Sequence, residues 1–289
     1  MADLPRHTGP SRIFAPGLLE GQVIIISGAG TGIGKAAALE LARLGATVVG
    51  CGRREEPLAG MVGEVIEAGG TAEADTLDIR DEATVDAFMD GVVERHGRID
   101  VLVNNAGGQF LSPAEAITPK GFRTVIDLNL QGTWQMTHAA ATKAFIPQES
   151  GKVISVTLSP HHGMPGMVHS GAARAAVENM MRTLSIEWSR FNVKLCAIAP
   201  GQFGTETFRT KYPQAVTKNI ERSIPAGRVG EPEEMAWLVA YLASPAGDFF
   251  SGAVLTIDGA RDNWAGPWPP EHLADDAGSL PAEERRSTT

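Results

Sequence analysis

Short runs of apolar residues alternate along the chain with longer stretches whose apolar positions recur at helical spacing. The first run, Val23–Ile26, is continuous, which is typical of a parallel strand covered on both faces. Runs of this kind predict strands at Val23–Ser27, Thr47–Cys51, Glu73–Leu77, Val101–Asn104, Val153–Thr157, Val193–Ala199 and Ala253–Asp258. The stretches between them predict helices at Lys35–Leu44, Glu55–Ala68, Asp81–His96, Pro119–Phe145, Ser170–Arg190 and Pro232–Leu242. This alternation predicts an α/β fold with helices on both faces of a parallel sheet.

Three segments depart from the alternation. Residues 1–20 form an N-terminal arm rich in proline, glycine and charge, and residues 261–289 form a C-terminal tail rich in proline, tryptophan and charge. Residues 201–230 are irregular and precede the last helix. The pattern shows no internal repeat and no linker, so we expect one domain over residues 21–260. We expect the tail to lie on the surface or on a neighbouring subunit.

Composition narrows the classes of function. The 289 residues carry a net charge of −9, which argues against nucleic acid as a partner. No apolar run approaches the length of a membrane span, and the N-terminus has no apolar core of a secretory signal. Cys51 and Cys196 fall in predicted strands and are interpreted as buried free thiols. The last three residues are not a peroxisomal address. These features favour a cytoplasmic protein.

A glycine-rich turn follows the first strand and opens the first helix. Glycines at 28, 32 and 34 allow the strand to turn, a pyrophosphate to approach the backbone and the helix to pack closely. The free amides at the helix start then hold the phosphates. The order of strand, glycines and helix predicts a dinucleotide site that includes Gly28, Thr31, Gly32, Ile33 and Gly34.

The end of the second strand indicates which dinucleotide binds. Arg53 and Arg54 stand where an enzyme specific for NAD usually places an acid, so the sequence favours NADP(H). A solvated pair at a helix start is the alternative. Asp78 and Ile79, after the third strand, are expected at the adenine, with a helix N-cap as the alternative for Asp78.

These motifs together resemble the short-chain dehydrogenase/reductase family. The matching residues are Ser27-Gly28-x-x-x-Gly32-Ile33-Gly34, Asn104-Asn105-Ala106-Gly107, Asn129 within Asp127–Gly132, and Pro200-Gly201. The resemblance covers nearly all of residues 20–260 and implies a doubly wound, seven-stranded Rossmann sheet. It implies that Asn105, Ala106 and Gly107 lie along the cofactor, that Pro200, Gly201, Phe203 and Thr205 line the nicotinamide, and that Asn129 orients water.

The flanking segments resemble one part of that family. Phe14–Gly21, Gly107–Glu115 and His169–Arg174 are similar to peroxisomal trans-2-enoyl-CoA reductases and 2,4-dienoyl-CoA reductases. This similarity implies an acyl thioester substrate whose carbon–carbon double bond accepts the hydride. The family resemblance also implies a homotetramer or homodimer, assembled through the two longest helices.

The chain departs from the family at its catalytic signature. Ser170 holds the position of the usual tyrosine, and Arg174 that of the usual lysine. A serine is a poor acid for protonating an alkoxide, and arginine does not readily relay a proton. Reduction of a double bond conjugated to a thioester needs only donors that stabilise an enolate. We expect these donors around Thr157, Ser159 and Ser170.

Several other residues have weaker claims. His161, His162 and His169 are possible acids but form no metal site. Of the two tyrosines, Tyr241 is expected to pack in a helix and Tyr212 lies in the irregular segment; neither is expected to be the catalytic acid. The basic residues of that segment are candidate anchors for the phosphates of the substrate, with a solvated surface as the alternative: Arg209, Lys211, Lys218 and Arg222.

The sequence therefore predicts an NADPH-dependent 2-enoyl-thioester reductase, in which Asn129, Thr157, Ser159, Ser170 and Arg174 serve catalysis and Arg174 also contacts the cofactor. Two alternatives remain: an alcohol or carbonyl oxidoreductase with an altered site, and a cofactor-binding regulatory protein without catalysis. No metal is expected.

Overall fold

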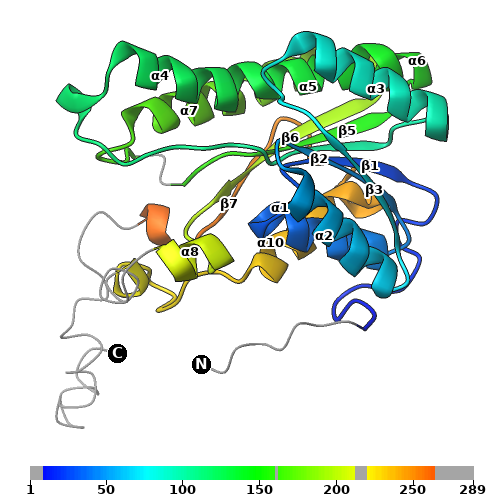
Figure 1. The fold of residues 1–289 in the computed structure, drawn as a ribbon, viewed down its shortest axis with the longest axis horizontal. Helices are drawn as coiled ribbons and strands as arrows, with labels where there is room; N and C mark the ends of the chain where they lie inside the picture. Colours follow the sequence, from blue (N-terminus) through cyan, green and yellow to red (C-terminus); the bar gives the residue numbers. More distant parts are fainter. Residues whose placement is uncertain (1–8, 160–161, 212–219, 264–289) are drawn as a thin grey trace, which may run out of the picture.

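Seven parallel strands form a single sheet in the computed structural model, which describes residues 9–159, 162–211 and 220–263 (Figure 1). The strands are β1 Val23–Ser27, β2 Thr47–Gly52, β3 Thr71–Thr76, β4 Val101–Asn104, β5 Gly151–Val156, β6 Val193–Pro200 and β7 Val254–Ile257. Their spatial order is β3-β2-β1-β4-β5-β6-β7. The chain therefore reverses direction across the sheet between β1 and β4, as in a doubly wound Rossmann fold.

Helices cover both faces of this sheet (Figure 1). They are α1 Gly32–Arg43, α2 Glu55–Glu67, α3 Glu82–His96, α4 Pro119–Ile126, α5 Gly132–Ala140, α6 Ile146–Gln148, α7 Val168–Glu187, α8 Glu206–Lys211 and α10 Pro232–Ala243. Helices α1, α2 and α10 lie on one face, and the α3–α7 group lies on the other. Among the described residues, no helix is long and apolar enough to cross a membrane.

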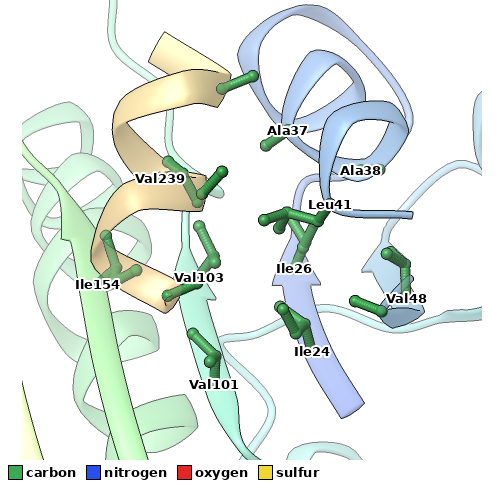
Figure 2. Close-up of a cluster of buried hydrophobic side chains, with 14 of the residues drawn as sticks. Ile24, Ile26, Ala37, Ala38, Leu41, Val48, Val101, Val103, Ile154 and Val239 are labelled. Carbon is green, nitrogen blue, oxygen red and sulfur yellow. The ribbon is translucent and has the colours of Figure 1, made fainter. Parts of the chain in front are cut away.

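The alternation of side chains along β1 explains its continuous apolar run. Ile24 and Ile26 belong to the core cluster under α1 and α10, whereas Val23 and Ile25 belong to the cluster under α3, α5 and α7. Successive residues of a strand point to opposite faces, so both sets must be apolar when helices cover both faces. Figure 2 shows the first cluster, with Leu41 of α1 and Val239 of α10 packed over the strands.

The predicted helix at 119–145 is a continuous helical path, but it is not a regular α-helix. It runs from α4 to α6 through two π-helical segments, Asp127–Gln131 and Ala141–Phe145. π-Helical turns occur frequently at functional sites. The first segment contains Asn129, which the family motif predicts to lie in the active site.

Other predicted boundaries shift by a few residues. Helix α7 begins at Val168 and not at Ser170, and α1 begins at Gly32 and not at Lys35. Strand β3 starts at Thr71, because its pairing with β2 begins at Thr47↔Thr71. The segment expected to be irregular after β6 contains the short helix α8.

The described part of the N-terminal arm packs on the domain. Leu19 is fully buried in the cluster of α1 and α10, and the Ser11 hydroxyl donates to Glu40 Oε1 at 2.5 Å. Cys51 and Cys196 are free and buried, as expected. Burial raises the pKa of both thiols to about 12, so they remain protonated and unreactive at neutral pH.

Candidate active site

A cleft of about 310 Å³ lies at the carboxyl ends of β1, β2 and β4, where the strand order reverses. Ligands of doubly wound sheets bind at this position. Many of the residues predicted to bind the cofactor line it: Gly28, Thr31, Ile33, Arg53, Arg54, Asp78, Ile79, Asn105, Ala106, Gly107 and Thr205. Gly32 and Gly34, at the start of α1, are not among the lining residues.

The turn after β1 requires glycine for steric reasons. A Cβ atom on Gly34 would lie 2.2 Å from the Gly28 carbonyl oxygen, and Gly28 itself has a φ of +70°. The turn therefore brings the backbone to the start of α1 with no side chain in between. Helix α1 has no acidic residue in its first turn, so its positive end is available to an anion.

Two asparagines join the end of β4 to its neighbours. The Asn105 side-chain amide donates to the carbonyl oxygens of Ser27 and Gly28 at 3.1 and 3.2 Å. The Ser27 hydroxyl accepts from the backbone N–H groups of Asn105 and Ala106. Asn104 Nδ2 donates to Thr137 Oγ1 at 2.9 Å. These bonds fix the floor of the cleft relative to the glycine-rich turn.

The outer end of the cleft carries Arg53 and Arg54, both exposed. Asp78 lies beside them, and hydrogen bonds from Arg80 hold the pKa of this carboxyl below its usual range. Asp78 does not cap the following helix. That position is held by Asp81, whose side chain accepts from Thr84 N at 3.1 Å.

Asn129 is fully buried behind Gly107, which lines the cleft. Its Oδ1 accepts from the backbone N–H of Gly108 at 3.1 Å, and its Nδ2 donates to the Gly108 carbonyl at 2.8 Å. Both ends of this side-chain amide are thus paired with a single residue of the loop after β4. In this structure Asn129 fixes the position of that loop.

Arg174 lies beside Asn129. Its Nη1 donates to the Val156 carbonyl at 2.7 Å, and burial lowers its pKa to about 10, so the guanidinium remains charged at neutral pH. A Cβ atom on Gly107 would lie 2.1 Å from Arg174 Nη2 and 2.7 Å from Asn129 Oδ1. Three predicted site residues from three separate elements therefore meet at one point.

Ser170 is fully buried, and its hydroxyl donates to Gln109 Oε1 at 2.7 Å. The oxygen of this side-chain amide is thus occupied, and its NH₂ group has no hydrogen-bond partner among the described residues, in a side chain that is exposed as a whole. No sequence motif pointed to Gln109 as a site residue. Its position directly after Gly107 and Gly108, in the loop that follows the predicted fourth strand, is the one sequence feature that could have indicated it.

The hydroxyls of Thr157 and Ser159 have partners other than Ser170. Thr157 Oγ1 donates to Glu178 Oε1 at 2.9 Å, and Ser159 Oγ donates to Asp258 Oδ2 at 2.6 Å. All four of these residues are buried or half-buried. Each hydroxyl hydrogen already has a carboxylate partner within the protein.

Of the four residues expected at the nicotinamide, one lines the cleft and three do not. Thr205 lines it directly. Pro200 and Gly201 lie at the end of β6, with Gly201 packed against Asp258. Phe203 is buried, and its ring lies against Gly230, where a Cβ atom would come within 2.6 Å.

The remaining candidates lie elsewhere. His162 is exposed and lies 3.3 Å from Asp262 Oδ1, and Arg209 forms an ion pair with Glu231 at 3.0 Å. Tyr241 packs edge-on against Phe250, as expected for a helix residue. His161, Tyr212 and Lys218 lie outside the described residues, as does the side chain of Lys211. The described residues contain no cluster able to hold a metal ion.

Comparisons with known proteins agree with this geometry. A family model described as enoyl-(acyl carrier protein) reductase matches residues 28–260. A probable 2,4-dienoyl-CoA reductase of Bacillus subtilis is 36% identical over 87% of this chain and 100% of its own. The peroxisomal 2,4-dienoyl-CoA reductase of Rattus norvegicus is 35% identical over 86% of each chain.

A solved structure shows the same fold. The citronellol catabolism dehydrogenase AtuB of Pseudomonas aeruginosa PAO1 has a TM-score of 0.78 and 38% sequence identity, covering 86% of this chain and 98% of its own. The sheet order, the glycine-rich turn and these relatives lead to one conclusion: the chain belongs to the short-chain dehydrogenase/reductase family of oxidoreductases.

Proposed function

We propose that this protein uses NADPH to reduce the carbon–carbon double bond of a 2-enoyl or 2,4-dienoyl thioester. The observation that carries the proposal is the bond between Ser170 and Gln109. Ser170 stands where the family resemblance places a catalytic tyrosine, and it binds a side-chain amide instead of supplying an acid. The relatives named 2,4-dienoyl-CoA reductases support a thioester substrate.

The cleft fits a dinucleotide. The turn at Gly28–Gly34 leaves the start of α1 open, and Thr31 and Ile33 face the space in front of it. Pyrophosphate at this position would be held by backbone amides and by the helix dipole. Arg174 would hold the nicotinamide ribose. When bound, NADPH supplies the hydride for the reaction.

The arginines favour NADPH over NADH. Arg53 and Arg54 line the outer end of the cleft, and a 2′-phosphate there would lie between cationic side chains. Asp78 is the nearby carboxylate, and it is engaged by Arg80 in a two-point ion pair. This ion pair favours NADPH, because it reduces the repulsion between the Asp78 carboxylate and the 2′-phosphate of the cofactor.

The side chains around Gly107, Ser170 and Arg174 fit enolate stabilisation better than carbonyl protonation. Hydride addition at the β carbon moves negative charge to the thioester oxygen, which needs oriented donors, and the α carbon then takes a proton from water. The free NH₂ group of Gln109 is one such donor, and the charged Arg174 contributes a positive field. The Thr157 and Ser159 hydroxyls, which we expected to serve here, already donate to carboxylates.

A substrate panel tests this proposal. Oxidation of NADPH is followed with crotonyl-CoA, 2-octenoyl-CoA and 2,4-decadienoyl-CoA, beside ketones and aldehydes that lack a conjugated double bond. Turnover of the thioesters alone supports the proposal. If a ketone or an aldehyde is reduced faster than the thioesters, carbonyl reduction becomes the better supported function. Tight NADPH binding without turnover of any compound would support a protein without catalysis.

A further inference from the structure

A patch of exposed apolar side chains adjoins the Ser170–Gln109 pair. Its members lie on the loop after β4, at the start of α4 and at the start of α7, with these exposed fractions: Leu111 75%, Val168 50%, Phe110 41% and Phe122 36%. We call this set the apolar mouth. Grouped apolar surface of this kind marks a binding site more often than isolated exposed residues do.

Contacts tie Phe110, Phe122 and Leu111 to the segment around the start of α7, where Val168 is the neighbour of His169 in the chain. The rings of Phe110 and Phe122 both flank the imidazole of His169, with centroid distances of 4.4 and 6.5 Å. Leu111 packs over Gly166, where a Cβ atom would lie 2.6 Å from Leu111 Cδ1. The loop after β4 is therefore seated on the segment that leads into α7.

His169 is the buried residue against which Phe110 and Phe122 pack. It is fully buried, and its Nδ1 accepts from the backbone N–H of Ser170 at 2.8 Å. The ring hydrogen therefore lies on Nε2, which has no hydrogen-bond partner. The mouth therefore offers a ligand mainly hydrocarbon and aromatic surface.

We infer that the apolar mouth binds the hydrocarbon chain of the substrate, so that the enzyme prefers thioesters whose chain extends well beyond the double bond. This inference rests on the proposed function. Gln109, the proposed donor to the thioester oxygen, is followed directly by Phe110 and Leu111. Two residues of chain span at most about 7 Å, so the Cα of Leu111 lies within that distance of the Cα of Gln109. A short chain ends before it reaches Leu111, whereas a longer one covers it.

The continuity of the mouth with the site favours a substrate chain over a second protein as its occupant. Each methylene that leaves water for such a surface improves binding by about two- to fourfold when half to all of its area is covered. We therefore expect kcat/KM of the unmodified protein to rise at least tenfold from crotonyl-CoA to 2-octenoyl-CoA. A smaller further gain is expected for 2-dodecenoyl-CoA.

The test uses polar replacements of nearly the same shape. In the double variant Leu111→Asn and Val168→Thr, the loss of kcat/KM should grow with chain length and reach about tenfold for 2-dodecenoyl-CoA. Ile186→Thr is the control, because Ile186 is an exposed residue near the opposite end of α7. It should behave as the unmodified protein with every thioester.

A second readout does not depend on turnover. Saturated butyryl-CoA and decanoyl-CoA are titrated calorimetrically into the protein with NADP⁺ present, and only the longer compound should bind more weakly to the double variant. Equal losses for short and long chains, or a flat dependence on chain length in the unmodified protein, would overturn the inference while leaving the proposed function intact. A change of molecular mass in the double variant would assign the mouth to a subunit contact and also overturn it. Absence of turnover with every thioester would remove the proposed function, and this inference with it.

Discussion

The two ends of the cleft are built by different means. At the end formed by β1 and α1, the backbone makes the site, and side chains are excluded from it: a Cβ on Gly34 would collide with the Gly28 carbonyl. At the end formed by β4 and α7, side chains make the site through bonds between distant residues, as in the pair of Ser170 and Gln109. A site made of backbone permits very few residue types, whereas a site made of side-chain pairs permits many combinations.

The largest expected effect falls on the backbone end. Gly34→Ala should lower NADPH affinity by at least a hundredfold, because its Cβ would lie 2.2 Å from the Gly28 carbonyl and displace the turn. Fluorescence titration with NADPH measures the effect. Gly60→Ala is the matched control, since Gly60 lies in α2 with no atom near its Cβ position. Normal NADPH binding by the Gly34 variant would show that the turn does not hold the cofactor.

Arg174 of α7 lies against Gly107, and its removal is expected to have the next largest effect. Arg174→Ala should lower kcat by about a hundredfold and weaken NADPH binding, because misplaced reactants alone can cost that much. Arg174→Lys keeps a charge and should recover part of the loss. Steady-state kinetics with both cofactor and thioester varied separate the two effects. An Arg174→Ala variant with an unchanged kcat would exclude a role for this charge in the reaction.

Gln109 tests the side-chain end alone. Gln109→Met removes the amide with little change of shape and should lower kcat about tenfold to a hundredfold, which is less than the roughly 10²–10³ lost with a buried oxyanion donor, because Gln109 is exposed to water. Ser170→Ala, which frees the amide without removing it, should have a smaller effect. The dissociation constant of NADPH should stay the same in both variants. If Ser170→Ala proves the more damaging of the two, the serine acts directly and not through Gln109.

The smallest expected effect concerns cofactor choice. Replacing Arg53 and Arg54 with alanine should raise KM for NADPH about tenfold and leave KM for NADH nearly unchanged, because only NADPH carries the 2′-phosphate. Both residues are exposed, which limits the size of the effect. Equal KM values for the two cofactors in the unmodified protein would refute the preference.

This difference between the ends also explains what the sequence revealed. The parallel sheet and the glycine-rich turn follow from local patterns, since both depend on residues close together in the chain. The bond between Ser170 and Gln109 spans 61 residues, and that between Ser159 and Asp258 spans 99. No local pattern reports such pairs, so the sequence indicated the hydroxyls but not the carboxylates that engage them.

Asn129 is an intermediate case. Its motif located it in the site, but its partner, the backbone of Gly108, depends on the π-helical turn at Asp127–Gln131. A sequence motif gives the identity of a residue and leaves open how the local helix orients it.

That π-helical turn has a consequence for chain length. A π turn holds one residue more than the α-helical turn it replaces, so the segment between α4 and α5 has a residue in excess of a regular helix. Deleting any one residue of 127–131 would let the regular α-helix form. The helices on either side would keep their orientation, because an α-helical turn closes with one residue fewer, but the residues within the turn would be reoriented. Asn129 would then leave Gly108 even though every neighbouring residue type was kept. The number of residues between Ile126 and Gly132 is therefore as much a part of the active site as the asparagine itself.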